Sequence, residues 1–309
     1  MMAKLLACRP DYRPTPAAAR GLTLVELLVV LTILAILAGV AVVSTDTVIR
    51  QGRFEATQQT LAAIEQAVLG PEPYRSEDGR LATAGFVADI GRLPEKLEEL
   101  WEPLGLPAFG FVPADADQVD PADADPDVVI PSGWRGPYLR LPIGRQELRD
   151  GWGNLFELEG DSESGEEIVR ISSVGPDLPA GDPAWEGEEL AIVFRDAESD
   201  RARTAIQVTV WQRGEDGLEP PSGTGDLVVR LFSPKDGGVD VVATDEESLD
   251  STAGSFVFSE VPIGTHVIRA YVTGAVDRKS PPLQITVHPL RSTTWQLVLP
   301  SPSPPPDEP

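Results

Sequence analysis

The hydrophobic pattern at the start of the chain predicts one long helix. Residues 22–43 read LTLVELLVVLTILAILAGVAVV, an apolar run that contains a single charge, Glu26. Further on the pattern is amphipathic, and its apolar residues recur at helical spacing at Phe54, Leu61, Ile64 and Val68. No proline interrupts residues 22–70, and Gly70-Pro71 is a stop signal, so the helix is expected to cover this whole stretch.

After this helix the pattern changes to short elements. Residues 94–101 predict a short amphipathic helix, and residues 155–158 and 168–171 alternate as strands do. From about Arg203 the chain predicts seven strands, typical of a β-sandwich: Ile206–Trp211, Leu227–Phe232, Val239–Ala243, Ser255–Phe258, His266–Val272, Leu283–Val287 and Thr294–Leu299. The predicted fold class is α+β, a long N-terminal helical spine packed on a small antiparallel sheet and followed by an all-β sandwich.

Composition narrows the classes of function. Of the 309 residues, 25 are Lys or Arg and 49 are Asp or Glu, and the net charge of −24 argues against a nucleic-acid partner. One cysteine, Cys8, and two histidines, His266 and His288, exclude a disulfide framework and a Cys/His zinc site. Both histidines are expected to be ordinary strand residues. No G-x-S-x-G, P-loop or H-E-x-x-H signature occurs, so we expect no enzyme and no catalytic residues.

The apolar run is long enough to cross a membrane. A bilayer core needs about 20 apolar helical residues, and Lys4, Arg9, Arg13 and Arg20 precede the run. The positive flank predicts a single-pass inner-membrane protein, with residues 1–21 cytoplasmic and the domains after Val43 periplasmic. Glu26 within the run would cost about 2.5–3.5 kcal/mol, so it is expected to have a partner or a function.

A basic leader followed by Gly21, Leu22, Thr23, Leu24, Val25, Glu26 and an apolar run resembles the N-terminus of type IV prepilins and pseudopilins. The resemblance implies that prepilin peptidase cleaves between Gly21 and Leu22 and methylates the new N-terminus. It also implies that Glu26 neutralises the terminal amine of a neighbouring subunit during assembly. This chain has Leu22 where the family usually has phenylalanine.

Four motifs beyond the helix, in this order, resemble the major pseudopilin of type II secretion: GRLP (91–94), GWRGPYL (133–139), DGWGN (150–154) and ISSVGPD (171–177). That family binds calcium in a loop, which implies a carbonyl ligand at Val174 and a carboxylate ligand at Asp177. The second carboxylate is open between Asp182, Glu188 and Glu189. The acidic insert 114–127 resembles the start of an EF-hand, but Val128 and Trp134 stand at its glycine and glutamate positions, so we expect a solvated, mobile loop.

Residues 254–266, GSFVFSEVPIGTH, resemble carboxypeptidase regulatory-like, transthyretin-like sandwiches, in which the two aromatics lie in the core. The expected domains are a leader (1–21), the spine helix (22–70), a pseudopilin-like head (71–200), the sandwich (203–299) and a disordered tail (300–309).

These resemblances together imply a pseudopilin subunit of a type II secretion system. Its partners would be other pseudopilins, prepilin peptidase, the inner-membrane platform, and a secreted substrate or the outer-membrane channel. Two alternatives stay open. One is a minor type IV pilin or adhesin whose sandwich binds a ligand, and the other is a membrane-tethered binding protein that never polymerises.

Overall fold

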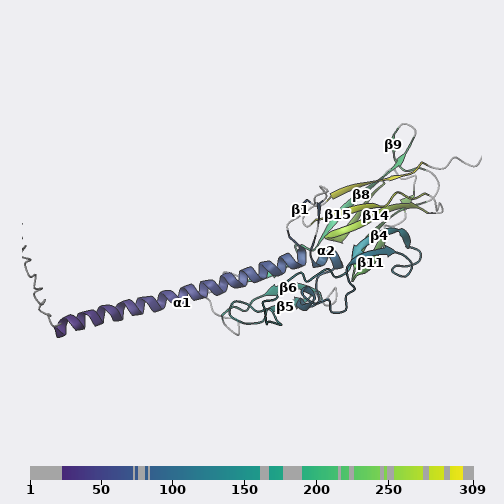
Figure 1. Ribbon diagram of the computed structural model, residues 1–309. Helices are drawn as coiled ribbons and strands as arrows, with labels where there is room; N and C mark the ends of the chain where they lie inside the picture. The colour runs from purple at the N-terminus through teal and green to yellow at the C-terminus, as the bar shows by residue number, and fades with distance from the viewer. Residues whose placement is uncertain are drawn as a thin grey trace, which may run out of the picture. The chain divides into compact units, whose positions relative to one another are not determined.

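The computed structural model describes residues 23–71, 74–75, 81–82, 84–160, 167–176, 190–214, 217–222, 226–243, 247–248, 254–273, 278–288 and 293–301 (Figure 1). Of the side chains in these ranges, those of residues 38–47, 74–75, 81–82, 243 and 247–248 lie outside the description. The chain divides into two compact units, Met1–Gly52 and Arg53–Pro309. The predicted head and sandwich both lie in the second unit, so the boundary between them stays a prediction.

The predicted long helix is confirmed as α1 (Leu24–Leu69), and the division between the two units falls within it. In the second unit its apolar stripe is buried at the predicted positions Phe54, Leu61, Ile64 and Val68. The helix ends at Gly70, whose φ of 87° is a left-handed conformation that favours glycine.

The residues after α1 form small elements around one core. They are β1 (Tyr74–Arg75), β2 (Leu81–Ala82), α2 (Phe86–Ile90), a 3-10 helix (Leu97–Leu100), β5 (Glu157–Gly160), β6 (Ile168–Ser172) and β7 (Ala191–Val193). The last three strands pair in the order β5-β6-β7. Ile64 of α1, Phe86 of α2, Leu100 and Ile171 of β6 meet in the core. The 3-10 helix replaces the short helix predicted over 94–101, and Leu97 and Leu100 are buried as expected.

The C-terminal strands form two facing sheets. The larger has the order β11-β10-β14-β15, with β12 also paired to β10, and the smaller has the order β13-β8-β16, with β9 paired to β8. All seven predicted strands are present: β8 (Arg203–Arg213), β10 (Asp226–Lys235), β11 (Gly238–Ala243), β13 (Ser255–Pro262), β14 (Gly264–Val272), β15 (Leu283–Val287) and β16 (Thr293–Leu299). Among the C-terminal residues that the structure describes, two further strands of two residues each were not predicted, β9 (Leu218–Glu219) and β12 (Glu247–Ser248).

Alternate residues of the facing strands fill the space between these sheets. Phe256 and Phe258 of β13 are both 4% exposed and pack there with Val208 of β8 and Leu231 of β10. The predicted fold class, α+β with a β-rich C-terminal region, is therefore confirmed.

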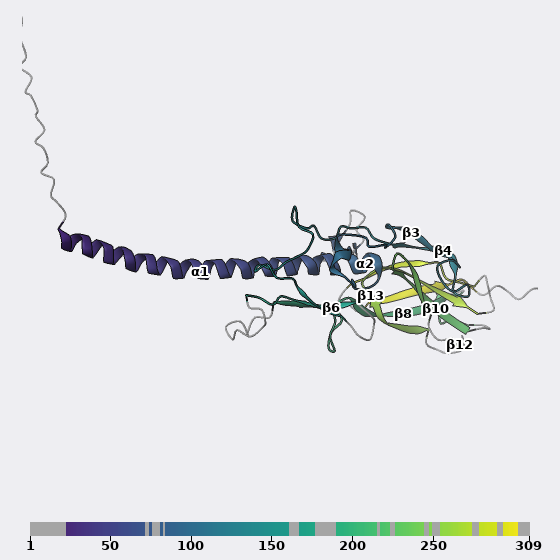
Figure 2. The same cartoon turned by 90° about the horizontal axis from the view of Figure 1, so that it is seen from below.

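A third layer covers the outer face of the larger sheet. The hairpin of β3 (Gly110–Ala114) and β4 (Asp125–Ser132) lies beside the strands of the sandwich (Figure 2). Its buried side chains Val128 and Ile130 pack against Phe232 of β10 and Val267 of β14. Strand β10 is consequently buried on both faces, which explains its almost continuous apolar sequence.

The expectation that residues 114–127 form a solvated loop is wrong at its C-terminal end. Asp125 is 3% exposed and belongs to β4. Its Oδ2 accepts hydrogen bonds from the Arg269 guanidinium at 2.7 Å and the Tyr271 hydroxyl at 2.6 Å, and Asp123 pairs with Arg230 at 3.1 Å. These cations belong to strands far along the chain, so the sequence pattern did not reveal the partners; Asp117 and Asp120 are exposed as expected.

Candidate functional site

The start of α1 carries the residues that the sequence assigns to assembly. The Thr23 hydroxyl accepts a hydrogen bond from the backbone N–H of Glu26, with N···O 3.2 Å, and the Glu26 side chain is exposed. Thr-x-x-Glu is the capping-box signature, which satisfies an amide that the helix itself cannot pair. The capping role of Thr23 was not predicted, although this spacing is readable in the sequence. The processing residues Gly21 and Leu22 lie outside the described residues.

The first turns of α1 expose apolar side chains on every side of the helix. The exposed residues are Leu24, Val25, Leu27, Leu28, Val29, Val30, Leu31, Ile33, Leu34, Ile36 and Leu37. A helix that is apolar all round needs an apolar environment supplied from outside itself.

Among the residues whose side chains are described, no helix is long and apolar enough to cross a membrane. The expected span 22–43 overlaps residues 38–47, whose side chains are not among those described.

The base of the expected calcium loop is held by a hydrogen-bonded turn. Both oxygens of the buried Asp150 are engaged: Oδ1 accepts from the backbone of Trp152 and Asn154 at 2.9 and 2.8 Å, and Oδ2 accepts from the Ser173 hydroxyl at 2.7 Å. The Ser173 N–H donates to the Leu190 carbonyl at 2.9 Å, so the two ends of the loop are joined.

Thr57 of α1 ties this turn to the spine. Its hydroxyl, fully buried, accepts from the backbone N–H of Gly151 at 2.8 Å, a contact that sequence analysis missed. Of the five candidate calcium ligands, Val174 is described, whereas Asp177, Asp182, Glu188 and Glu189 fall outside the described residues. Within the part of the chain that is described, no group of three or more His, Cys, Asp or Glu side chains is placed to hold a metal ion.

The GWRGPYL motif closes over a second buried carboxylate, Asp89 of α2. Asp89 accepts from the Arg135 guanidinium at 2.6 and 3.0 Å and from the Tyr138 hydroxyl at 3.0 Å. Burial raises the pKa of the Asp89 carboxyl, and the Arg135 charge opposes this rise. Because both oxygens are engaged by the motif, this cluster fixes the fold of the head and presents no spare reactive group.

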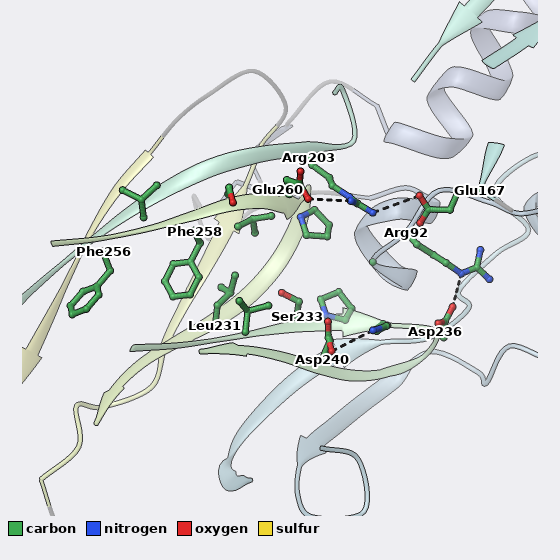
Figure 3. A pocket seen from close by; sticks show the side chains of 18 of the residues that line it. Arg92, Glu167, Arg203, Leu231, Ser233, Asp236, Asp240, Phe256, Phe258 and Glu260 are labelled. Carbon is green, nitrogen blue, oxygen red and sulfur yellow. Dashed lines mark hydrogen bonds and ion pairs between the residues drawn. The ribbon is translucent and has the colours of Figure 1, made fainter. Parts of the chain in front are cut away.

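A groove of about 760 Å³ lies between the edges of the two sandwich sheets. On one side it is lined by consecutive residues of β13, and on the other by Leu231, Ser233 and Lys235 of β10 together with Asp240 and Val242 of β11. Figure 3 shows Phe256 and Phe258 on one side and Leu231 on the strand that faces them.

Ion pairs surround the end of this groove nearest the head. Arg203 pairs with Glu167 at 3.6 Å and with Glu260 at 3.8 Å, and Arg92 pairs with Asp236 at 2.5 Å (Figure 3). No pattern in the sequence indicates this groove, because its lining comes from segments far apart in the chain.

The N-terminal segment matches a known family of sequence motifs. Residues 17–42 match the prokaryotic N-terminal methylation motif, so the chain carries a type IV prepilin-like methylation motif at the start of α1. No curated protein matches the chain.

Solved structures resemble about a third of the chain. A candidate carbohydrate-binding protein from Pseudomonas aeruginosa is 14% identical, with a TM-score of 0.20, over 33% of this chain and 90% of its own length. Two crystal structures of a pilus-presented adhesin are 11% identical, with TM-scores of 0.18 and 0.19, over 33% of this chain and 28% of their own length. Likenesses at these TM-scores do not identify a function.

Proposed function

We propose that this protein is a pseudopilin subunit of a type II secretion system. Prepilin peptidase cleaves it between Gly21 and Leu22 and methylates the new terminus, and the subunit then joins a periplasmic pseudopilus. The observation that carries the proposal is the methylation motif over residues 17–42, which coincides with the stretch of α1 whose apolar side chains are exposed all round. Lipid before assembly, and neighbouring helices after it, supply the apolar environment that this stretch needs.

Glu26 sets the register of assembly in this proposal. Thr23 already satisfies the Glu26 backbone amide, and the carboxylate, which is exposed, is left to pair with the terminal amine of a neighbouring subunit. Pairing the two charges removes the cost of holding either one alone in an apolar surrounding.

The arrangement of the head supports the finer assignment to the secretion pseudopilins. The GRLP segment places Leu93 in the head core, GWRGPYL and ISSVGPD place Trp134, Tyr138 and Ile171 in or against it, and DGWGN supplies the Asp150 turn beside them. The resemblance in sequence order thus corresponds to residues that lie together in space.

Glu26→Gln tests the assembly role, and Glu55→Gln is its matched control because Glu55 is an exposed carboxylate further along the same helix. Produced with the peptidase and the secretion platform, the E26Q protein should be processed yet largely absent from pelleted filaments. The E55Q protein should be incorporated like wild type. Equal incorporation of E26Q and wild type would contradict the role given to Glu26. Filaments found outside the cell would instead favour the alternative, a surface pilin or adhesin.

We also propose that the loop from Val174 to Glu189 binds calcium, through the Val174 carbonyl, Asp177 and one of Asp182, Glu188 and Glu189. Calcium prefers six to eight oxygen ligands, which carbonyls and carboxylates supply. The joined ends of the loop support this, because the hydrogen bond between Ser173 and Leu190 closes the segment that carries the candidate ligands at its base. Asp150 is not counted as a ligand, since both its oxygens already accept hydrogen bonds.

Thermal unfolding with calcium or with a chelator tests the loop. Calcium at about 100 times its Kd should stabilise the wild-type protein by about 2.7 kcal/mol. Asp177→Asn should reduce this gain, whereas Glu198→Gln, which removes an exposed carboxylate outside the loop, should keep it. The same melting temperature with calcium and with chelator for the wild type would refute the proposal.

A further inference from the structure

The groove beside β13 is a place where the smaller sheet of the sandwich is one strand short. The larger sheet continues past β10 to β11, but within the described residues the smaller sheet ends at β13. The inner face of β11 is therefore left uncovered, and Val242, which lines the groove, is 47% exposed. A strand placed beside β13 would cover it.

The register of β13 shows which backbone groups such a strand would meet. Val210 of β8 donates its N–H to the carbonyl of Gly254, and the pairing places Phe256 opposite Val208. Hydrogen-bonded and non-hydrogen-bonded pairs alternate in an antiparallel ladder, so Phe256 and Phe258 bond to β8. The N–H and C=O groups of Ser255 and Val257 consequently point away from β8, toward the groove.

The lining indicates the side chains that an added strand would carry. Consecutive residues from Ser255 to Pro262 line the groove, so it follows the strand edge for about 26 Å at about 3.3 Å per residue. Residues of the added strand that face inward would lie over Leu231 and Val242, which favours apolar side chains at alternate positions.

The charges at the head end of the groove favour a basic residue. Its cations Arg92 and Arg203 are 13% and 23% exposed and lie in ion pairs. Four carboxylates there are more exposed, at 43% to 77%: Glu95, Asp236, Asp240 and Glu260. A fifth, Glu167, is 9% exposed and pairs with Arg203. Among the lining cations Lys235 is comparably exposed, at 58%, and it pairs with Asp240 at 3.5 Å. The surface that an incoming segment meets is thus mainly negative.

We propose that the free edge of β13 binds an extended peptide segment of another protein by strand addition. The segment has apolar residues at alternate positions and a lysine or arginine at the end that lies over Asp236 and Asp240. The bulge between Phe258 and Val261 limits regular pairing to the part of the edge around Ser255 and Val257. This interaction does not depend on processing or on filament assembly, and it names a class of partner for the sandwich.

Val257→Pro is the direct test, because it removes an N–H that points into the groove and leaves the bonds to β8 in place. Val257→Thr, which keeps the N–H, is the matched control. The probe is the acetylated, amidated peptide Lys-Val-Thr-Val-Thr-Val carrying a fluorophore, titrated by anisotropy against the detergent-solubilised full chain. We expect V257P to weaken binding at least about tenfold, equivalent to about 1.4 kcal/mol, and V257T to bind like wild type.

Two peptides with N-methyl groups on alternate amides test the pairing without a protein variant. The peptide methylated on the amides that face β13 should fail to bind, and the other should bind. Equal binding of both, equal binding to V257P and wild type, or no saturable binding up to about 1 mM would overturn the proposal. If a second copy of the chain occupies the edge instead, the protein should dimerise, V257P should abolish the dimer, and the peptide should not bind. That result would also overturn the proposal.

Discussion

The ion pair between Asp125 and Arg269 should be a main stabilising contact between the acidic insert and the sandwich. Asp125 is 3% exposed and the Arg269 side chain 7%, and they meet at 2.7 Å. Replacing Asp125 with asparagine keeps the size of the side chain but leaves the Arg269 charge buried without its close anion. Removing one partner of a buried pair costs about 3–5 kcal/mol, and we expect the lower end of this range because the amide can still accept from the Tyr271 hydroxyl.

Thermal unfolding of the full chain in detergent measures this effect. For a unit of this size about 3 kcal/mol corresponds to a fall in Tm of about 6–12 °C. Asp127→Asn is the control, because Asp127 contacts the same Arg269 and Lys279 but its side chain is 61% exposed, where solvent screens the charge. Equal melting temperatures of D125N and D127N would contradict this stabilising role of Asp125.

Two further predictions concern buried polar groups. Burial lowers the pKa of His266 to about 4, so the unfolded chain, with a pKa of about 6.5, takes up the proton first. The contribution of His266 to the free energy of unfolding should be fully present above pH 6.5 and fall by about 3 kcal/mol toward pH 4. In urea unfolding, the His266→Gln variant should lose this part of the pH dependence. Thr57→Val should cost about 1 kcal/mol, because the Gly151 N–H loses its acceptor, whereas Thr60→Val, whose hydroxyl bonds within α1, should cost less. A Thr57 variant no less stable than the Thr60 variant would contradict that assignment.

Local patterns in the sequence were sufficient for α1 and for the seven predicted strands of the sandwich, but not for the hairpin of β3 and β4. The stripe from Phe54 to Val68 repeats at helical spacing, and the alternation around Phe256 and Phe258 repeats at strand spacing, so each predicts which face is buried. Both signals depend on neighbours within a few residues, which a single sequence displays directly.

Contacts between distant segments were not predictable in this way. Asp125 resembles a residue of a solvated acidic loop until Arg269, 144 positions away, is placed beside it. The Arg203–Glu167 pair and the groove beside β13 likewise depend on how the sheets stack. Gly91 shows the same limit, because no local pattern indicates that an added Cβ would lie 1.8 Å from the Pro234 carbonyl oxygen of β10.

Processing of the N-terminal segment as a prepilin is the step on which the proposed function depends. Its most direct test is the intact mass and the first residue of the full chain, extracted from membranes after production with prepilin peptidase. We expect a chain that begins at Leu22 and carries one added methyl group. A chain that retains residues 1–21 in the presence of active peptidase would contradict it.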